Sequence, residues 1–394
     1  MQPNYNRTMA ACFVGYITQA IVNNFAPLLF LTFQSTYGIS LSQITLLTTF
    51  NFGVQLLVDL LSPRLIDRVG YRASAMAAHL LCALGLVLMT VLPGLLSVQG
   101  LFLAVMVYAV GGGLLEVLVS PIVEACPSEH KEAAMSLLHS FYCWGHVAVI
   151  LLSTLFFNLF GIHRWPILAC LWALIPIANC IAFARVPLAP LLPEGETGMT
   201  IRELTRSGLF WCFLLLMLAS GACEQAVSQW ASAFAEQSLS LSKRISDLAG
   251  PLFFALTMGT ARLVYGRFGD RWSLRRAMAL SGGACAVSYL MISLSPGPVA
   301  GLIGCGLCGL SVGILWPGSF SLASAALPRG GTALFALLAL GGDLGCTAGP
   351  TFVGIVSNAA GGSLRTGVAF ALIFPAALLA ALGLYHIQQR RQHA

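Results

Sequence analysis

The stretch ASAMAAHLLCALGLVLMTVLPGL, from Ala73 to Leu95, runs for 23 residues without a charged side chain. About 20 apolar residues let an α-helix cross the hydrocarbon core of a bilayer. The stretch lacks the strict alternation of a barrel strand, so it predicts a transmembrane helix. The whole chain is similar: 58% of its 394 residues are hydrophobic and 9% are charged, whereas soluble domains average about 25% charged residues. The sequence therefore predicts an all-α membrane protein.

Apolar runs of this kind recur along the chain, and polar breaks separate them. The longest stretch outside them, residues 185–206, is rich in Pro, Glu and Arg and predicts a cytoplasmic linker. The expected domains are therefore an N-terminal six-helix bundle at 1–184 and a C-terminal six-helix bundle at 207–394. The twelve predicted spans are 10–34, 42–63, 73–95, 99–124, 134–160, 164–184, 207–236, 245–266, 276–295, 298–325, 330–358 and 364–387.

The basic residues are distributed unevenly about these spans. An even number of spans puts both termini on one side of the membrane. If that side is the cytoplasm, 16 of the 20 Lys and Arg residues fall in inner segments, Arg262 among them, and four in outer segments. Such a bias is the positive-inside signal. The net charge of +6 then needs no nucleic-acid partner. We expect a multi-pass protein of a bacterial cytoplasmic (inner) membrane.

The twelve cysteines do not indicate a disulfide framework or a cofactor. Nearly all lie inside apolar runs, where a thiol is a small packing group. Cys305 and Cys308 form a C-x-x-C pair within one apolar run, without the second pair of a metal site. We expect no metal and no cofactor. The first apolar run is too long for a cleavable signal peptide.

The two halves resemble each other at an offset near 200 residues. Each half has six spans, so both halves share one orientation, which is typical of parallel repeats with a solute site midway between them. The matching positions are Ser40-Leu41-Ser42 with Ser240-Leu241-Ser242, Gly113 with Gly313, Glu116 with Trp316, and Asp67-Arg68 with Asp270-Arg271.

One of these matches carries a family resemblance. The segment GRFGDR, Gly266 to Arg271, followed by Arg275-Arg276, resembles the cytoplasmic signature of the major facilitator superfamily, and residues 67–72 form a similar first copy. The resemblance implies twelve transmembrane helices in two pseudo-symmetric bundles, which work as a monomeric secondary transporter. It also implies a cytoplasmic gate made of Asp67, Arg68, Arg72, Asp270, Arg271 and Arg275.

A narrower resemblance lies in the fourth and fifth spans. GLLEVLVSPIVEACP, residues 113–127, and SLLHSFYCWG, residues 136–145, are similar to the fucose–galactose–glucose symporter family. The resemblance makes Glu116 a proton- and substrate-linked carboxylate, His139 a substrate contact, and Asn23-Asn24 a paired asparagine. This sequence departs from the family just after the asparagine pair, because Phe25-Ala26-Pro27 contains no acidic residue.

Polar side chains inside the spans mark the predicted solute pathway. A charge at mid-bilayer costs about 2.5–3.5 kcal/mol on translocon scales, so such groups persist beside water or a partner. Burial favours the neutral carboxyl, which allows Glu116 to take up a proton near neutral pH. The proton-coupling candidates are Glu116, His139, Glu224 and Asp343. The substrate-binding candidates are Asn23, Asn24, Asn51, Gln55, His139, Tyr142, Trp144, His146, Glu224, Gln225, Gln229, Trp316 and Asp343.

The favoured function is proton-coupled uptake of a small polar solute, a sugar or sugar-like compound, with Glu116 as the leading protonation site. The alternatives are a proton-linked exporter of drugs or metabolites, and a sodium-coupled or facilitative carrier. An enzyme is not expected. Gly309-Leu310-Ser311-Val312-Gly313 matches G-x-S-x-G, but within an apolar helix rather than at a strand-to-helix elbow.

Overall fold

The computed structural model describes residues 4–38, 41–191, 198–231, 234, 243–295 and 297–393, and nearly all of them are helical. Two compact units group residues 1–128 with 141–196, and residues 129–140 with 197–394. Helix α5 (Lys131–Phe160) therefore contributes its first ten residues to the second unit and the rest to the first. The predicted division at residues 185–206 stays a prediction.

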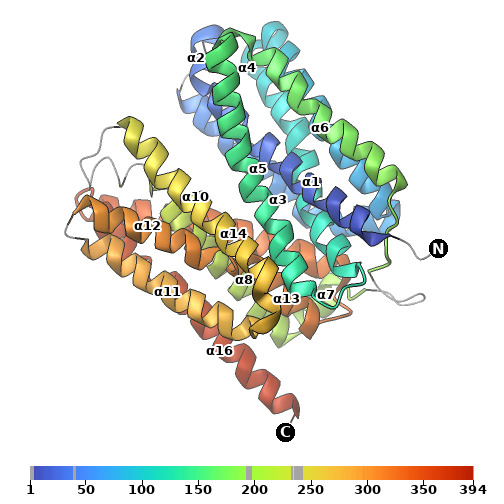
Figure 1. Cartoon of the computed structure of the whole chain (residues 1–394), viewed down its shortest axis with the longest axis vertical. Helices are drawn as coiled ribbons and strands as arrows, with labels where there is room; N and C mark the ends of the chain where they lie inside the picture. The colour runs from blue at the N-terminus through green and yellow to red at the C-terminus, as the bar shows by residue number, and fades with distance from the viewer. Residues whose placement is uncertain are drawn as a thin grey trace. The chain divides into compact units, whose positions relative to one another are not determined.

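The first unit is built around one long helix, α4 (Tyr71–Ala125). Helices α1, α3 and α6 pack against it (Figure 1). The elements of this unit other than α4 and α5 are α1 (Tyr5–Asn24), η1 (Ala26–Leu29), α2 (Phe30–Tyr37), α3 (Leu41–Val69), η2 (Ile162–Arg164) and α6 (Trp165–Arg185).

Helix α4 is a hairpin of two antiparallel arms rather than one rod. Ser97 has a left-handed φ of 53° and a ψ of −127°, which breaks the helix. The arms then pack closely, because a Cβ on Gly100 would collide with the Leu92 carbonyl and one on Gly111 would lie 2.6 Å from the Ala78 carbonyl. The two arms correspond to the predicted spans 73–95 and 99–124.

The second unit packs α8 and α14 tightly together, and α10 and α11 against α12. Its elements are α7 (Ile201–Thr205), α8 (Gly208–Ser228), α10 (Lys243–Phe268), η3 (Gly269–Arg271), α11 (Leu274–Leu294), α12 (Pro298–Val312), α13 (Leu315–Ala326), α14 (Gly331–Ala359), α15 (Leu364–Phe370) and α16 (Ile373–His393).

A short capped helix, α7, precedes α8. The Thr200 backbone N–H and hydroxyl both donate to the Glu203 carboxylate, at 2.7 and 2.9 Å, and the Glu203 N–H donates back to the hydroxyl at 3.2 Å. This is a capping box. These hydrogen bonds hold the pKa of Glu203 below its ordinary value.

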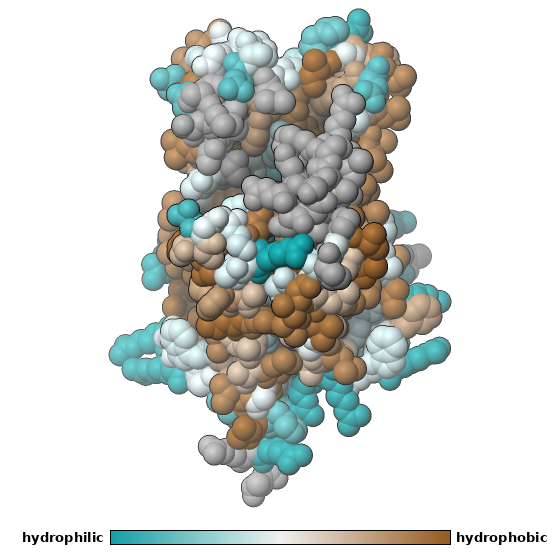
Figure 2. All heavy atoms as spheres, turned by 90° about the vertical axis from the view of Figure 1, so that its left-hand side faces the viewer, coloured by the Kyte–Doolittle hydropathy of each residue, from teal (hydrophilic) through white to brown (hydrophobic). Residues whose placement is uncertain are grey.

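The outer surface of the helices is apolar, as a lipid-facing surface must be. Nine helices of the described part are long and apolar enough to span a membrane, with both arms of α4 counted as one. Large apolar side chains such as Leu280, Leu294 and Leu95 are 73–75% exposed. Figure 2 shows apolar residues over much of the visible face. Soluble monomers rarely expose patches of this extent, so the chain is a multi-pass integral membrane protein.

Candidate functional site

The first unit holds a half-buried carboxylate, Glu116, against a buried neutral amide, Gln19. Gln19 on α1 is 3% exposed, and its Nε2 donates to Oε2 of Glu116 on α4 at 2.7 Å. A hydrogen bond to an ionised acceptor is stronger than one between neutral groups. This contact therefore ties α1 to α4.

Three amides continue the polar cluster one turn further along α1. The Asn23 side-chain oxygen accepts hydrogen bonds from Gln55 at 3.1 Å and from Asn51 at 3.5 Å, both on α3. Asn51 and Gln55 are 7% and 2% exposed. Glycine on α4 lets α3 approach α4 closely at this level, because a Cβ on Gly113 would lie 3.1 Å from Cβ of Val58. The cluster of Gln19, Asn23, Asn51, Gln55 and Glu116 is called the amide cluster below.

Aromatic hydroxyl groups lie beside the amide cluster. The Tyr16 hydroxyl is 3.1 Å from the Ser120 hydroxyl. The Tyr16 and Tyr142 rings meet edge to face, with centroids 6.3 Å apart. Buried amides and hydroxyls next to aromatic faces are the groups that bind the hydroxyls and C–H faces of a small polar solute.

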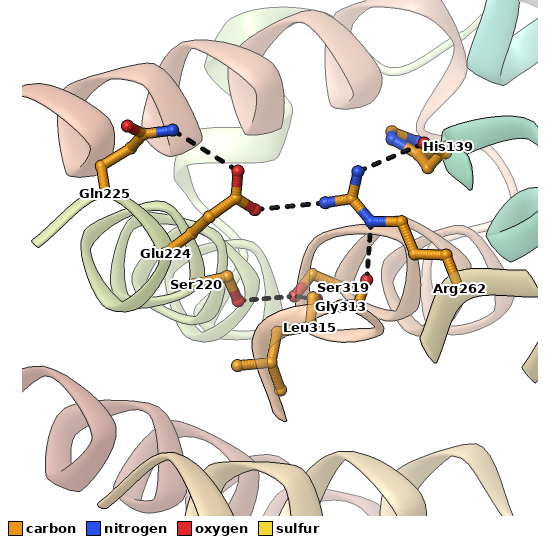
Figure 3. A network of polar contacts seen from close by, with 8 residues as sticks. All are labelled: His139, Ser220, Glu224, Gln225, Arg262, Gly313, Leu315 and Ser319. Atoms are coloured by element: carbon orange, nitrogen blue, oxygen red, sulfur yellow. Dashed lines mark hydrogen bonds and ion pairs between the residues drawn. The ribbon is translucent and has the colours of Figure 1, made fainter. Parts of the chain in front are cut away.

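The second unit holds a buried ion pair (Figure 3). Arg262 on α10 lies 3.1 Å from Oε2 of Glu224 on α8, with side chains 5% and 14% exposed. The Arg262 guanidinium also donates from Nε to the Gly313 carbonyl at 2.8 Å and from an Nη to the His139 carbonyl at 3.2 Å. Buried charges are retained in this way, paired and hydrogen-bonded.

The sequence explains why the Gly313 carbonyl accepts this bond. Helix α12 ends at Val312 and α13 begins at Leu315. Pro317, four residues after Gly313, has no N–H and cannot donate back to that carbonyl. The Arg262 Nε supplies the missing donor.

Neighbouring polar groups extend this ion pair along α8. Gln225 donates to the second Glu224 oxygen at 3.4 Å, and Gln229 donates to Gln225 at 3.2 Å. On the other side, the Ser220 and Ser319 hydroxyls lie 3.3 Å apart and join α8 to α13 (Figure 3). These contacts bring together three of the predicted residues, Glu224, Gln225 and Gln229.

The other predicted residues make contacts outside these two clusters. The His139 ring is buried and stacks on Phe320 at 5.9 Å, and the Trp316 ring lies edge to face with Phe320 at 6.5 Å. Asn24 donates to the Ala20 carbonyl of its own helix at 2.9 Å. The remaining candidates, Trp144, His146 and Asp343, are each partly exposed. Because Glu116 and His139 belong to different units, their pairing stays a prediction.

Arg262 is a residue of the candidate site that sequence reasoning missed. It was counted among the inner-segment charges, and that interpretation is wrong, because its side chain is buried and paired with Glu224. Its position contained a usable signal. The offset of 203 residues between Asp67 and Asp270 also relates Arg262 to Asp59, which is itself fully buried on α3.

The helix contacts inside each unit reproduce this repeat. Gly113 faces Gln55 and Val58 of α3, and Gly313 faces Met258 and Ala261 of α10. The glycines are 200 residues apart, and each pair of facing residues is 203 apart. The internal similarity read from the sequence therefore extends to the packing.

The predicted gate residues are only partly described. Asp67, Arg68 and Arg271 are exposed, and the Asp270 side chain lies outside the described residues. Arg72 donates to the Phe183 carbonyl of α6. Arg275 donates to Nδ1 of His386 at 2.7 Å and to the Gln389 side chain at 3.3 Å, which fastens α11 to α16. Their action as a gate stays a prediction.

The family model of the Major Facilitator Superfamily matches residues 9–350. The chain belongs to the major facilitator superfamily. This confirms the resemblance first seen in the Gly266–Arg271 signature. A comparison with curated protein sequences gives no match.

Solved structures with this fold include two sugar symporters and an anion transporter. The E. coli fucose:proton symporter FucP has a TM-score of 0.81 at 16% identity, covering 96% of this chain and 98% of that one. The human organic anion transporter MFSD10 has a TM-score of 0.75 at 16% identity, covering 97% and 100%. The proton:xylose symporter XylE has a TM-score of 0.73 at 13% identity, covering 95% and 93%. At such identities the likeness establishes the fold alone.

Proposed function

We propose that this member of the superfamily is a proton-coupled symporter for the uptake of a small polar solute, a sugar or sugar-like compound, and that Glu116 carries the coupled proton. The observation that supports this most directly is the amide cluster, in which Gln19 donates to a Glu116 carboxylate at 2.7 Å. A half-buried carboxyl beside neutral hydrogen-bonding groups has no fixed positive charge to hold it ionised, which suits a group that gains and loses a proton. The nearby amides of Asn23, Asn51 and Gln55 are suited to sugar hydroxyls.

Glu116 is a better proton carrier than Glu224. The Glu224 carboxylate is 3.1 Å from the Arg262 guanidinium, and an adjacent positive charge favours the ionised form. The Gln19 amide is a neutral donor, which discriminates less between the two forms. In this proposal Glu224 and Arg262 both stay charged and their ion pair has no net charge. Glu116 gains and loses the proton.

One proton per transport cycle would supply enough free energy to accumulate the solute. A charge that crosses 100 mV supplies about 2.3 kcal/mol, which corresponds to roughly fifty-fold accumulation. The structural relatives FucP and XylE are named as proton symporters of sugars, which supports the choice of proton and solute. Alternating access of the two halves around the linker at residues 185–206, gated by the Asp67 and Asp270 signatures, completes the proposal.

The test is transport by the purified protein in proteoliposomes. A thermal-shift screen with L-fucose, D-xylose, D-glucose and D-galactose first selects the solute. Glu116→Gln is then compared with the native chain in two assays, accumulation driven by a pH gradient and exchange of labelled for unlabelled solute. We expect the variant to lose accumulation, by about fifty-fold, and to retain exchange, because exchange needs no net proton movement.

Glu124→Gln is the matched control, since it removes a carboxylate from the same helix, eight residues away. It should accumulate solute like the native chain. Undiminished proton-driven accumulation in Glu116→Gln would disprove the assignment of Glu116. Accumulation that follows a sodium gradient, or solute export against the pH gradient, would instead establish one of the alternative carriers.

A further inference from the structure

The first unit has a pocket that its proposed transport role does not use. It has a volume of about 710 Å³ and lies among the first turns of α1 and α4 and the last turn of α6. Sites for small molecules commonly measure about 300–1,000 Å³. All residues that line the pocket belong to the first unit.

The charges of this pocket all have one sign. Arg7, Arg72 and Arg185 line it, each from a different helix, and none of its described lining residues is acidic. Two helix N-termini add to the positive potential, because α1 and α4 have no acidic residue in their first turns. The pocket is therefore suited to an anion.

The arginines differ in how firmly they are held. Arg72 is half-buried and donates to the Phe183 carbonyl, which fixes it at the pocket wall. Arg7 and Arg185 are exposed, and within the described residues no ion pair or hydrogen bond occupies either guanidinium. Asn179, deeper in the pocket, is held by its bonds to the Ala11 carbonyl and to Nε2 of His79, at 2.9 and 2.7 Å. Two lining side chains, Arg72 and Asn179, are thus held by hydrogen bonds, and two cations at the rim are available to a ligand.

The walls favour a ligand with an apolar part. Six of the eleven lining residues are apolar: Ala10, Ala11, Val14, Ala182, Val186 and Pro187. The pocket lies where three spans of the membrane-crossing part begin or end. The positive-inside bias predicts that this end faces the cytoplasm, where acidic lipids attract basic segments.

We propose that this pocket, called the arginine pocket below, binds the phosphate headgroup of an acidic phospholipid, with Arg7, Arg72 and Arg185 around the phosphate and an acyl chain along the Ala10–Val14 side of α1. The guanidinium of arginine can donate two parallel hydrogen bonds to one phosphate. Such bidentate pairing is more specific in geometry than the attraction of a point charge. The site is separate from the amide cluster and does not depend on which solute is carried.

Native mass spectrometry of the full-length protein in detergent tests the proposal. Bound lipid is measured on titration with phosphatidylglycerol, with phosphatidylcholine and with inorganic phosphate. We expect saturable binding of phosphatidylglycerol, weaker binding of phosphatidylcholine, and no displacement of the lipid by millimolar phosphate. Arg7→Gln/Arg185→Gln should weaken phosphatidylglycerol binding by roughly ten-fold or more, because both arginines are at the rim.

Arg64→Gln/Arg276→Gln is the matched control. It removes the same charge from two exposed arginines outside the pocket and should bind phosphatidylglycerol like the native chain. A second variant, Ala10→Trp, fills the apolar side without changing the charge and should also reduce lipid binding. Ala10 is exposed, so the variant is expected to fold.

Two results would overturn the proposal. Equal loss of lipid in the pocket variant and the control would mean that binding follows net charge alone. Displacement of the lipid by inorganic phosphate, with Ala10→Trp unchanged, would identify a site for a soluble anion instead. Each result is measured on folded protein, because the melting temperature of every variant is compared with that of the native chain first.

Discussion

Arg262 shows how one buried charge is accommodated in a chain with few charges. Its guanidinium contacts one carboxylate and two backbone carbonyls that belong to different segments: Glu224 on α8, Gly313 after α12, and His139 on α5. A buried pair of this kind adds little net stability, since desolvation offsets the attraction. It does fix geometry, because one guanidinium joins three segments of the second unit.

Breaking this pair from one side should therefore be costly. Arg262→Gln leaves the Glu224 carboxylate buried without its cation, and we expect a loss of about 3–5 kcal/mol in the free energy of unfolding. Glu224→Gln should lose a similar amount. The double variant should recover much of that loss, since no uncompensated charge remains.

Thermal unfolding of the four proteins in one detergent measures this cycle. The native chain and the double variant are the two references for the single variants. If the losses of the two single variants add up in the double variant, Arg262 and Glu224 do not interact energetically, and the ion pair has no role in stability.

Helices α8 and α14 pack more closely than side chains normally permit. A Cβ on Gly345 would collide with the Leu218 carbonyl, one on Gly221 with the Gly342 carbonyl, and one on Gly349 would lie 2.6 Å from the Ala222 carbonyl. Lipid is as apolar as leucine, so close backbone contact through small residues replaces the hydrophobic effect as the source of helix association. Glycine is therefore required at these positions of the interface between α8 and α14.

Gly345→Leu should separate the two helices. The obstructing atom is a backbone carbonyl, which cannot turn aside, so we expect a loss of more than about 3 kcal/mol. The measurement is the melting temperature together with the yield of monodisperse protein. Gly383→Ala on α16 is the control, because open space surrounds that position, and it should be neutral or up to about 1 kcal/mol more stable. A native-like melting temperature for Gly345→Leu would show that α8 and α14 do not pack closely at this position.

At the scale of the whole molecule, the lipid environment determines where polar groups can lie. Many large apolar side chains are exposed, and many polar groups inside the units bond to one another, as in the amide cluster and around Arg262. Basic residues flank the predicted spans mostly on one side. Orientation should follow from this bias.

We predict that both termini are cytoplasmic. Green fluorescent protein fused after Ala394 should fluoresce in a bacterial host, and alkaline phosphatase fused there should be inactive. The reverse pair of readings would contradict the orientation. A fusion after Phe160, at the end of α5, is the internal control and should give the opposite pair of readings, because that end is predicted to face outward.

The sequence alone determined the class of protein, the spans and the repeat. These properties are local or additive, since a run such as Ala73–Leu95 is apolar in any fold and a glycine recurs after 200 residues whatever surrounds it. The sequence also identified candidate site residues, among them Glu116, Asn23, Gln55 and Glu224. Polar residues in apolar runs cost free energy in a membrane wherever they lie. The family match over residues 9–350 agrees with this level of description.

Only the tertiary structure decided which of these residues contact each other. Gln19 and Glu116 are 97 residues apart, and Glu224 and Arg262 are 38 apart. No local pattern encodes such pairs, because helix rotation and depth are set by packing across several helices. Arg262 was misassigned for this reason: a basic residue near the predicted end of a span resembles a topology anchor, and in the sequence only its repeat register with Asp59 set it apart. The arginine pocket is likewise a product of folding, since its three cations come from three helices.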